Sequence, residues 1–219
     1  MDSSLQTRRH DTSRNVLADW EDIPDPQKIK NIIEALRARG FEAEFVSDRK
    51  AALEKVRSLL PDGARVMTGG SKTLEEIGFT PLLMSGDHPW VNLKSKIMAE
   101  NDREKQFALR REAVFADYFL GSVHAVTSSG QLVAGSATGS QLAAYAYGGR
   151  NLILVVGTQK IVEDLDEALR RLREHSVPLE DRRMKSMGAP GTYLSKIFIY
   201  EREAQRNVHV ILVNEKLGF

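Results

Sequence analysis

One stretch near the middle of the chain, residues 116–160, constrains the fold more than any other part of the sequence. It carries seven of the sixteen glycines among Ser, Thr and apolar residues, so tight turns separate short segments that favour burial. A short strand at 118–120 precedes a hairpin whose strands, 125–127 and 131–134, flank a Ser-Ser-Gly turn. A glycine-rich loop and a small-residue helix then lead to 152–156, an aliphatic run typical of a strand covered on both faces. The succession predicts a βα unit.

Helix and strand patterns alternate through the rest of the chain as well. Asp25 and Pro26 suit the start of a helix that Gly40 ends, and 164–174 has the pattern of an amphipathic helix. Residues 178–191 are basic and predict an irregular segment. Further strands are expected at 41–46, 65–68, 196–200 and 208–213. The pattern predicts an α/β fold: a mostly parallel twisted sheet flanked by helices, with the last two strands as an antiparallel hairpin at one edge.

Composition excludes several classes of protein. Lys and Arg number 31 against 30 Asp and Glu, so no global charge attracts nucleic acid. The absence of Cys excludes disulfides, thiolate catalysis and Cys-ligated metal clusters. No apolar run approaches the roughly 18 residues of a membrane span, which predicts no membrane insertion and a cytoplasmic location. Residues 1–24 are polar and predict a mobile tail before a single domain at 25–219.

Two loops rich in glycine and hydroxyl groups each lead from a predicted strand into a predicted helix. Thr73 with Glu76, and Thr138 with Gln141, have the spacing of capping boxes at these helix starts. Ligands of parallel sheets collect beyond the carboxyl ends of the strands, where backbone N–H groups at helix starts favour anions. The predicted ligand-binding residues are Gly69, Gly70, Ser71, Thr73, Gly135, Ser136, Thr138, Gly139, Lys160 and Asn214.

A second interpretation of the same loops needs no ligand. The glycines would permit close packing of helix on sheet and the threonines would only cap, since neither a complete phosphate-binding loop motif nor a dinucleotide motif is present. His124, within the glycine-rich stretch, and Glu215, after an apolar strand, are the candidates for proton transfer. A histidine in that position is more often a hydrogen-bonded core residue. No His and carboxylate spacing suits a metal, and the sequence leaves open whether the chain binds a cofactor.

Five stretches resemble the LUD domain, the lactate-utilisation family. The similarity covers roughly residue 27 to the C-terminus, and the combination is specific although each motif alone is weak. The stretches read GGSKTLEEIG from Gly69, ADYFL from Ala116, AVTxxGxLV from Ala125, GTQKIV from Gly157 and HVILVNExLG from His209.

The resemblance implies the α/β fold of glucosamine-phosphate deaminase, ribose-phosphate isomerase and the CoA-transferases. It also implies a link to bacterial oxidation of L-lactate, in which LUD proteins act beside iron–sulfur subunits. Two departures from the family pattern limit what the resemblance implies about function. Relatives often carry a Cys-rich segment where this chain reads MKSMGAPG at 184–191, and Ser128 and Ser129 stand near the hairpin where CoA-transferases use a nucleophilic Glu.

Three functional hypotheses follow. The first is a LUD-domain protein that binds a small anionic metabolite or nucleotide phosphate in the glycine-lined crevice and serves lactate or other organic-acid utilisation. The second is an ATP-dependent ligase or a sugar-phosphate isomerase-like enzyme of the same fold. The third is a non-catalytic subunit of an oxidoreductase complex that docks through the tail and the basic segment 182–185. The sequence leaves open whether the chain is an enzyme, and a homo-oligomer is compatible with it.

Overall fold

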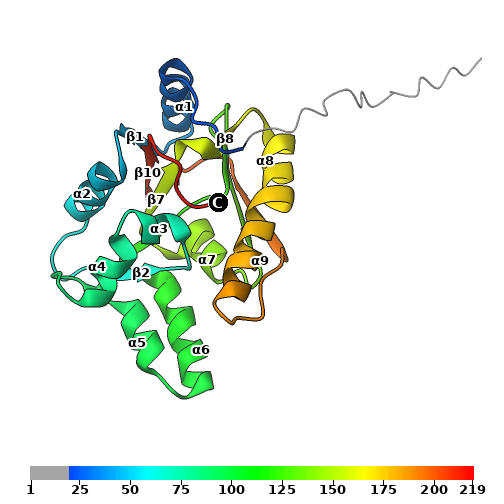
Figure 1. Cartoon of the computed structure of the whole chain (residues 1–219). Coiled ribbons are helices and arrows are strands. Elements are labelled where there is room, and N and C mark those ends of the chain that lie inside the picture. Colours follow the sequence, from blue (N-terminus) through cyan, green and yellow to red (C-terminus); the bar gives the residue numbers. More distant parts are fainter. Residues whose placement is uncertain (1–19) are drawn as a thin grey trace, which may run out of the picture.

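A computed structural model describes residues 20–219, so the predicted tail at 1–24 lies mostly outside the described residues. Within this range a sheet of six parallel strands forms the centre of the molecule (Figure 1). The order across the sheet is β1 (Glu42–Val46), β10 (Asn207–Val213), β7 (Asn151–Gly157), β4 (Tyr118–Gly121), β2 (Arg65–Thr68) and β3 (Val91–Asn92). The predicted α/β class with a mostly parallel sheet is confirmed.

A second, smaller sheet contains the predicted hairpin. Its order is β8 (Ile161–Val162), β5 (Ala125–Thr127), β6 (Leu132–Ser136) and β9 (Lys196–Tyr200). The β5 and β6 strands pair antiparallel around the Ser-Ser-Gly turn, as predicted. The pairing of the last two strands was predicted wrongly, because β9 pairs with β6 whereas β10 lies between β1 and β7. Every residue from Val210 to Val213 is buried, which suits an internal strand covered on both faces.

Helices cover both faces of the central sheet. Asp25 caps α1 as predicted, by accepting a hydrogen bond from the Lys28 backbone N–H, and Ile29, Ile32 and Leu36 form the buried stripe. The helices are α1 (Pro26–Ala38), α2 (Arg49–Leu59), α3 (Lys72–Glu76), α4 (Phe79–Ser85), α5 (Leu93–Ala99), α6 (Arg103–Glu112), α7 (Ser140–Ala143), α8 (Leu165–Arg171) and α9 (Val177–Ser186). Shorter helical segments are η1 (Ala113–Phe115), η2 (Ala144–Gly148), η3 (Thr158–Lys160) and η4 (Leu172–Ser176).

Three local predictions were wrong. Ser71, rather than Thr73, caps α3 by accepting from the Leu74 N–H, and α7 begins at Ser140, after Gly139, with no capping side chain. The basic segment predicted to be irregular contains α9, because Pro178 is tolerated in a first turn and ion pairs at helical spacing join the charged side chains.

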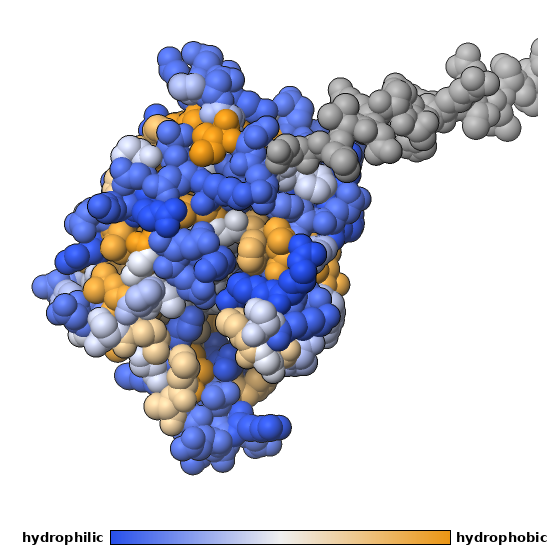
Figure 2. Space-filling view, in the orientation of Figure 1, coloured by the Kyte–Doolittle hydropathy of each residue, from blue (hydrophilic) through white to orange (hydrophobic). Residues whose placement is uncertain are grey.

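Two hydrophobic layers hold the fold together. One face of the sheet packs against α1, the second sheet and Tyr145 of η2, and the other packs against α2, α3 and α4. The face of the molecule shown in Figure 2 is largely hydrophilic with scattered apolar groups. None of the helices between residues 20 and 219 is long and apolar enough to span a membrane. The C-terminus lies between α3 and the α8–α9 pair, over the carboxyl ends of the central strands (Figure 1).

Candidate functional site

A buried lysine lies at the carboxyl end of the central strand β7. Lys160, in η3 directly after that strand, is only 2% exposed. Its Nζ donates to Thr73 Oγ1 at 3.0 Å and to Ser122 Oγ at 3.1 Å. Burial, reinforced by the charge of Arg171 and opposed by Glu76, lowers the pKa of Lys160 to about 7. Two hydroxyl partners leave one of the three ammonium protons for a further acceptor.

Ser122 owes its position to a tyrosine from η2. The Ser122 N–H donates to Tyr145 Oη at 3.2 Å, and the Tyr145 hydroxyl donates to the Ser122 carbonyl at 3.0 Å. Gly121 permits this approach, because a Cβ there would lie 1.9 Å from the Tyr145 oxygen. Burial raises the pKa of Tyr145, so its hydroxyl stays protonated. The hydroxyl that contacts Lys160 is therefore held on a fixed backbone.

Two further cations lie near the same edge. Arg171, fully buried, donates to the His124 carbonyl and to Ser176 Oγ at 3.0 Å, and burial lowers its pKa to about 10. Its Nε–H has no partner in the described part of the chain. Half-buried Lys94 donates to Thr68 Oγ1 and the Gly69 carbonyl, and burial lowers its pKa. Buried cations held by neutral groups are costly, which makes this edge a candidate anion site.

The predicted proton carrier His124 is neutral in this environment. Its Nδ1 accepts a hydrogen bond from the Gly135 N–H at 3.1 Å, which places the proton on Nε2. Burial, with the charges of Lys160 and Arg171, lowers the pKa of His124 to about 3. Residues 20–219 supply no partner for Nε2–H. His124 is thus suited to donating a hydrogen bond and is a weak base.

The two glycine-rich loops meet, as the sequence predicted. A Cβ on Gly69 would lie 2.8 Å from Gln141 Oε1, and Gln141 Nε2 donates to the Gly135 carbonyl at 3.3 Å. Gly70 is exposed and faces open space. In the second loop, by contrast, hydroxyl groups close their own turn: Ser136 Oγ accepts from Gly139 N–H at 2.9 Å, and Thr138 Oγ1 accepts from Ser140 N–H at 3.3 Å.

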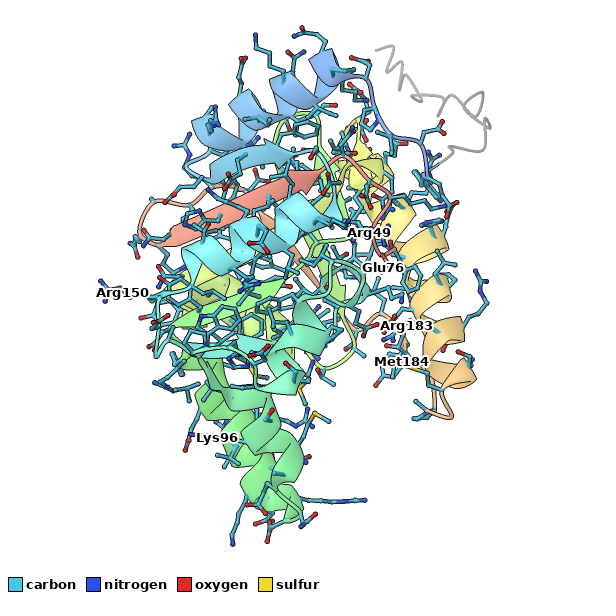
Figure 3. All side chains as sticks on the ribbon, turned by 60° about the vertical axis from the view of Figure 1, so that its left-hand side comes forward. Arg49, Glu76, Lys96, Arg150, Arg183 and Met184 are labelled. Atoms are coloured by element: carbon cyan, nitrogen blue, oxygen red, sulfur yellow. The ribbon has the colours of Figure 1, made fainter. Side chains whose placement is uncertain are left out.

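The side chains of Glu215 and Asn214 form no hydrogen bond or ion pair with the Lys160 cluster in the described structure. Glu215 accepts from the Arg49 backbone N–H at 3.1 Å and pairs with Arg49 Nε at 2.6 Å, so it serves the start of α2. The Asn214 side chain is exposed, and its backbone N–H donates to the Val46 carbonyl. Figure 3 shows Arg49 and Glu76 on the same side of the molecule, facing the α9 residue Arg183.

The C-terminal residues pass directly over the lysine. Gly218 N–H donates to Glu76 Oε2 at 2.7 Å, and Gln159 Nε2 donates to the Leu217 carbonyl at 2.9 Å. A Cβ on Gly218 would lie 2.4 Å from Thr73 Oγ1 and 3.2 Å from Lys160 Nζ. Glycine is required because the chain crosses the ammonium at close range.

Sequence reasoning identified Lys160, Thr73 and His124 but missed several of their partners. Ser122 and Lys94 reach the site only through the fold and carry no local signal. Arg171 does carry a signal in the sequence, because it lies three residues after Ala168 and so shares the buried face of α8. No group of three His, Cys, Asp or Glu residues that suits a metal ion occurs in the described chain.

Comparison with known proteins agrees with this fold. The structure resembles the crystal structure of a DUF162 family protein from Deinococcus radiodurans, with a TM-score of 0.53 and 13% identity over 88% of this chain and 100% of that one. At this identity the likeness shows the fold alone. No curated protein matches the chain. The family model of the LUD domain matches residues 29–213, which include Thr73, Ser122 and Lys160, and the chain therefore belongs to the LUD domain family.

Proposed function

We propose that this LUD domain binds a small anionic metabolite, a carboxylate or a phosphate, at the carboxyl edge of its central sheet. The observation that carries the proposal is the Lys160 ammonium, which is buried against two neutral hydroxyls and forms no ion pair within the described residues. An isolated buried cation is unfavourable until an anion neutralises it. A ligand anion would supply that missing charge.

The surrounding groups favour negative charge in the ligand. Lys94 and Arg171 add two cations, whereas the nearby carboxylate of Glu76 already accepts from Gly218 and pairs with Lys72. Neutral His124 offers a donor from Nε2. The first loop adjoins the site through Gly69, whose carbonyl accepts from Lys94. The polar side chains around Lys160 are mainly hydrogen-bond donors, which matches a carboxylate or phosphate better than a cation or an apolar ligand.

Lactate and its oxidation product are small carboxylates, so a role in lactate or other organic-acid utilisation is consistent with family membership. Because the chain has no Cys, electron transfer in such a role would belong to separate iron–sulfur subunits. Binding is favoured over turnover by this chain alone. Of the two predicted proton carriers, Glu215 is held by Arg49 and His124 is weakly basic.

Isothermal titration with lactate, pyruvate and inorganic phosphate tests the proposal. Replacing Lys160 with Met removes the charge and keeps the apolar stem, and loss of one charge-assisted hydrogen bond should weaken binding roughly tenfold or more. Lys30→Met, at an exposed position on α1, is the matched control and should bind like the wild type. Equal affinities of wild type and Lys160→Met for whichever anion binds, or no binding of any of the three, would refute the proposal.

The pH dependence gives a second readout. Lys160 loses its proton as pH rises through about 7 in the absence of ligand, so affinity for a carboxylate should fall between pH 6 and pH 9. Lactate and pyruvate stay ionised across that range, and the change therefore reports on the protein. An affinity that stays flat with pH would show that Lys160 is not the charge donor.

A further inference from the structure

A second hollow lies at the opposite, amino-terminal edge of the central sheet. Its lining comes from the segments that enter three neighbouring strands: Phe115 precedes β4, Arg150 precedes β7, and Arg206 precedes β10. Its volume is about 510 Å³. This falls within the range of small-molecule pockets, and the hollow is separated from Lys160 by the length of the strands.

A close contact of two short helices places aromatic rings on one wall. Gly148 at the end of η2 packs on η1, where a Cβ would lie 2.2 Å from Val114 Cγ1 and 2.3 Å from the Val114 carbonyl oxygen. Only glycine permits this approach. The residues next to this contact, Phe115 and Tyr147, both line the hollow and are 59% and 77% exposed. Rings this exposed offer flat apolar surface to a ligand.

The floor is a saturated polar network. Arg206 donates to Glu203, to the Tyr200 hydroxyl and to the backbone carbonyls of Ala144, Tyr145 and Gly149, which uses all of its donor nitrogens. The hydrogen bond from Tyr200 and those from three backbone N–H groups outweigh burial and hold the pKa of Glu203 at about 2. Arg206 and Glu203 therefore neutralise each other, and the floor contributes no net charge.

Two arginines at the rim remain without ion pairs. Arg150 and Arg202 both line the hollow and are exposed, and neither forms a hydrogen bond or an ion pair within the described residues. Figure 3 shows the Arg150 side chain projecting from the body of the molecule. With the floor neutral, the hollow carries two uncompensated positive charges beside two exposed rings.

We propose that this amino-edge hollow binds a nucleoside phosphate. The base would lie against Phe115 and Tyr147, since aromatic stacking accepts any base, and the phosphate would be held by the guanidinium groups of Arg150 and Arg202. A ligand with a flat ring and an anionic group satisfies both features of the hollow, whereas a simple carboxylate uses only one. This site is independent of the anion site proposed at Lys160.

Equilibrium dialysis with AMP tests the proposal on the full chain. The double variant Arg150→Gln/Arg202→Gln should bind AMP at least roughly tenfold more weakly than wild type, whereas Arg103→Gln, an exposed arginine on α6, should have no effect. Tyr147→Ala should weaken AMP binding and leave competition by inorganic phosphate unchanged. Lys160→Met should bind AMP like the wild type, which separates the two sites.

Three results would overturn the inference. The first is the absence of saturable AMP binding. Binding of an acidic peptide to Arg150 and Arg202 in place of AMP counts as this result. The second is an unchanged AMP affinity in the double arginine variant with a native circular dichroism spectrum. The third is loss of AMP binding in Lys160→Met, which would assign the nucleotide to the carboxyl edge. Failure of the anion proposal at Lys160 would leave the AMP results untouched.

Discussion

Replacing Lys160 with methionine should change how the stability of the fold depends on pH. The pKa of this lysine falls from 10.5 to about 7 because the ammonium is buried. Between these two values the unfolded chain binds more protons than the folded one, so the free energy of unfolding of the wild type rises with pH. The cost of the buried charge is fully present below about pH 7 and is gone above pH 10.5. Methionine removes that dependence.

The size of the effect follows from the same shift. One pKa unit corresponds to about 1.4 kcal/mol, so holding the ammonium costs the fold on the order of 5 kcal/mol at low pH. Methionine also loses two hydrogen bonds worth about 1 kcal/mol each. The partners are not stranded, because Thr73 Oγ1 lies 3.3 Å from Ser122 Oγ and donates to it. Lys160→Met should therefore be more stable than wild type by roughly 3 kcal/mol near pH 6, and this gain should largely disappear near pH 9.

Urea unfolding at three pH values, with linear extrapolation, measures both quantities. Lys30→Met should follow the wild type at every pH, because Lys30 is an exposed residue on the outer face of α1. Groups that do not sense the Lys160 charge titrate alike in wild type and variant and cancel in the difference. Two outcomes contradict the reasoning: parallel pH profiles for wild type and Lys160→Met, or a variant several kcal/mol less stable near pH 6. Either would mean that the ammonium is well solvated in the fold.

Two other substitutions probe the supports of the site. Tyr145→Phe removes the hydroxyl bonded to both backbone groups of Ser122. It should lower the free energy of unfolding by roughly 2 kcal/mol and weaken carboxylate binding in titrations, and full retention of both would show that Ser122 is positioned by something else. Gly218→Ala introduces a Cβ 2.4 Å from Thr73 Oγ1 at a φ of +64°. Its melting temperature should fall further than that of Gly188→Ala, where φ is +80° but the Cβ meets no neighbour; equal losses would mean that the contact over Lys160 is loose.

Local patterns in the sequence were sufficient for the elements that depend on near neighbours. The start of α1 at Asp25 and Pro26 and the turn at Gly130 need only a few residues to specify them, and both were predicted. The partners of β9 and β10 were not, because strand pairing is set by contacts between distant segments. The apolar run of β10 nevertheless indicated burial on both faces, which is incompatible with an edge hairpin.

The candidate site likewise contains residues that the sequence predicted and residues that it did not. Lys160 and Thr73 were predicted as ligand-binding residues from their positions after a strand and in a glycine-rich loop, and the fold joins them by a hydrogen bond across 87 positions of sequence. Thr73 was given the wrong local role, since Ser71 takes the helix cap and leaves the Thr73 hydroxyl for the lysine. Ser122 could not be found, because its role depends on a tyrosine 23 residues later.

That tyrosine connects the two edges of the sheet. The Tyr145 hydroxyl fixes the backbone of Ser122, whose side chain contacts Lys160, while the Tyr145 carbonyl accepts from Arg206 on the floor of the amino-edge hollow. Tyr145 is 2% exposed and packs edge-on against the Phe119 ring. Because it is surrounded by packed protein atoms, a movement of its hydroxyl or its carbonyl would displace neighbouring residues. One rigid side chain thus sets the positions of groups in both proposed sites, even though the two sites are proposed to bind different ligands and lie at opposite ends of the strands.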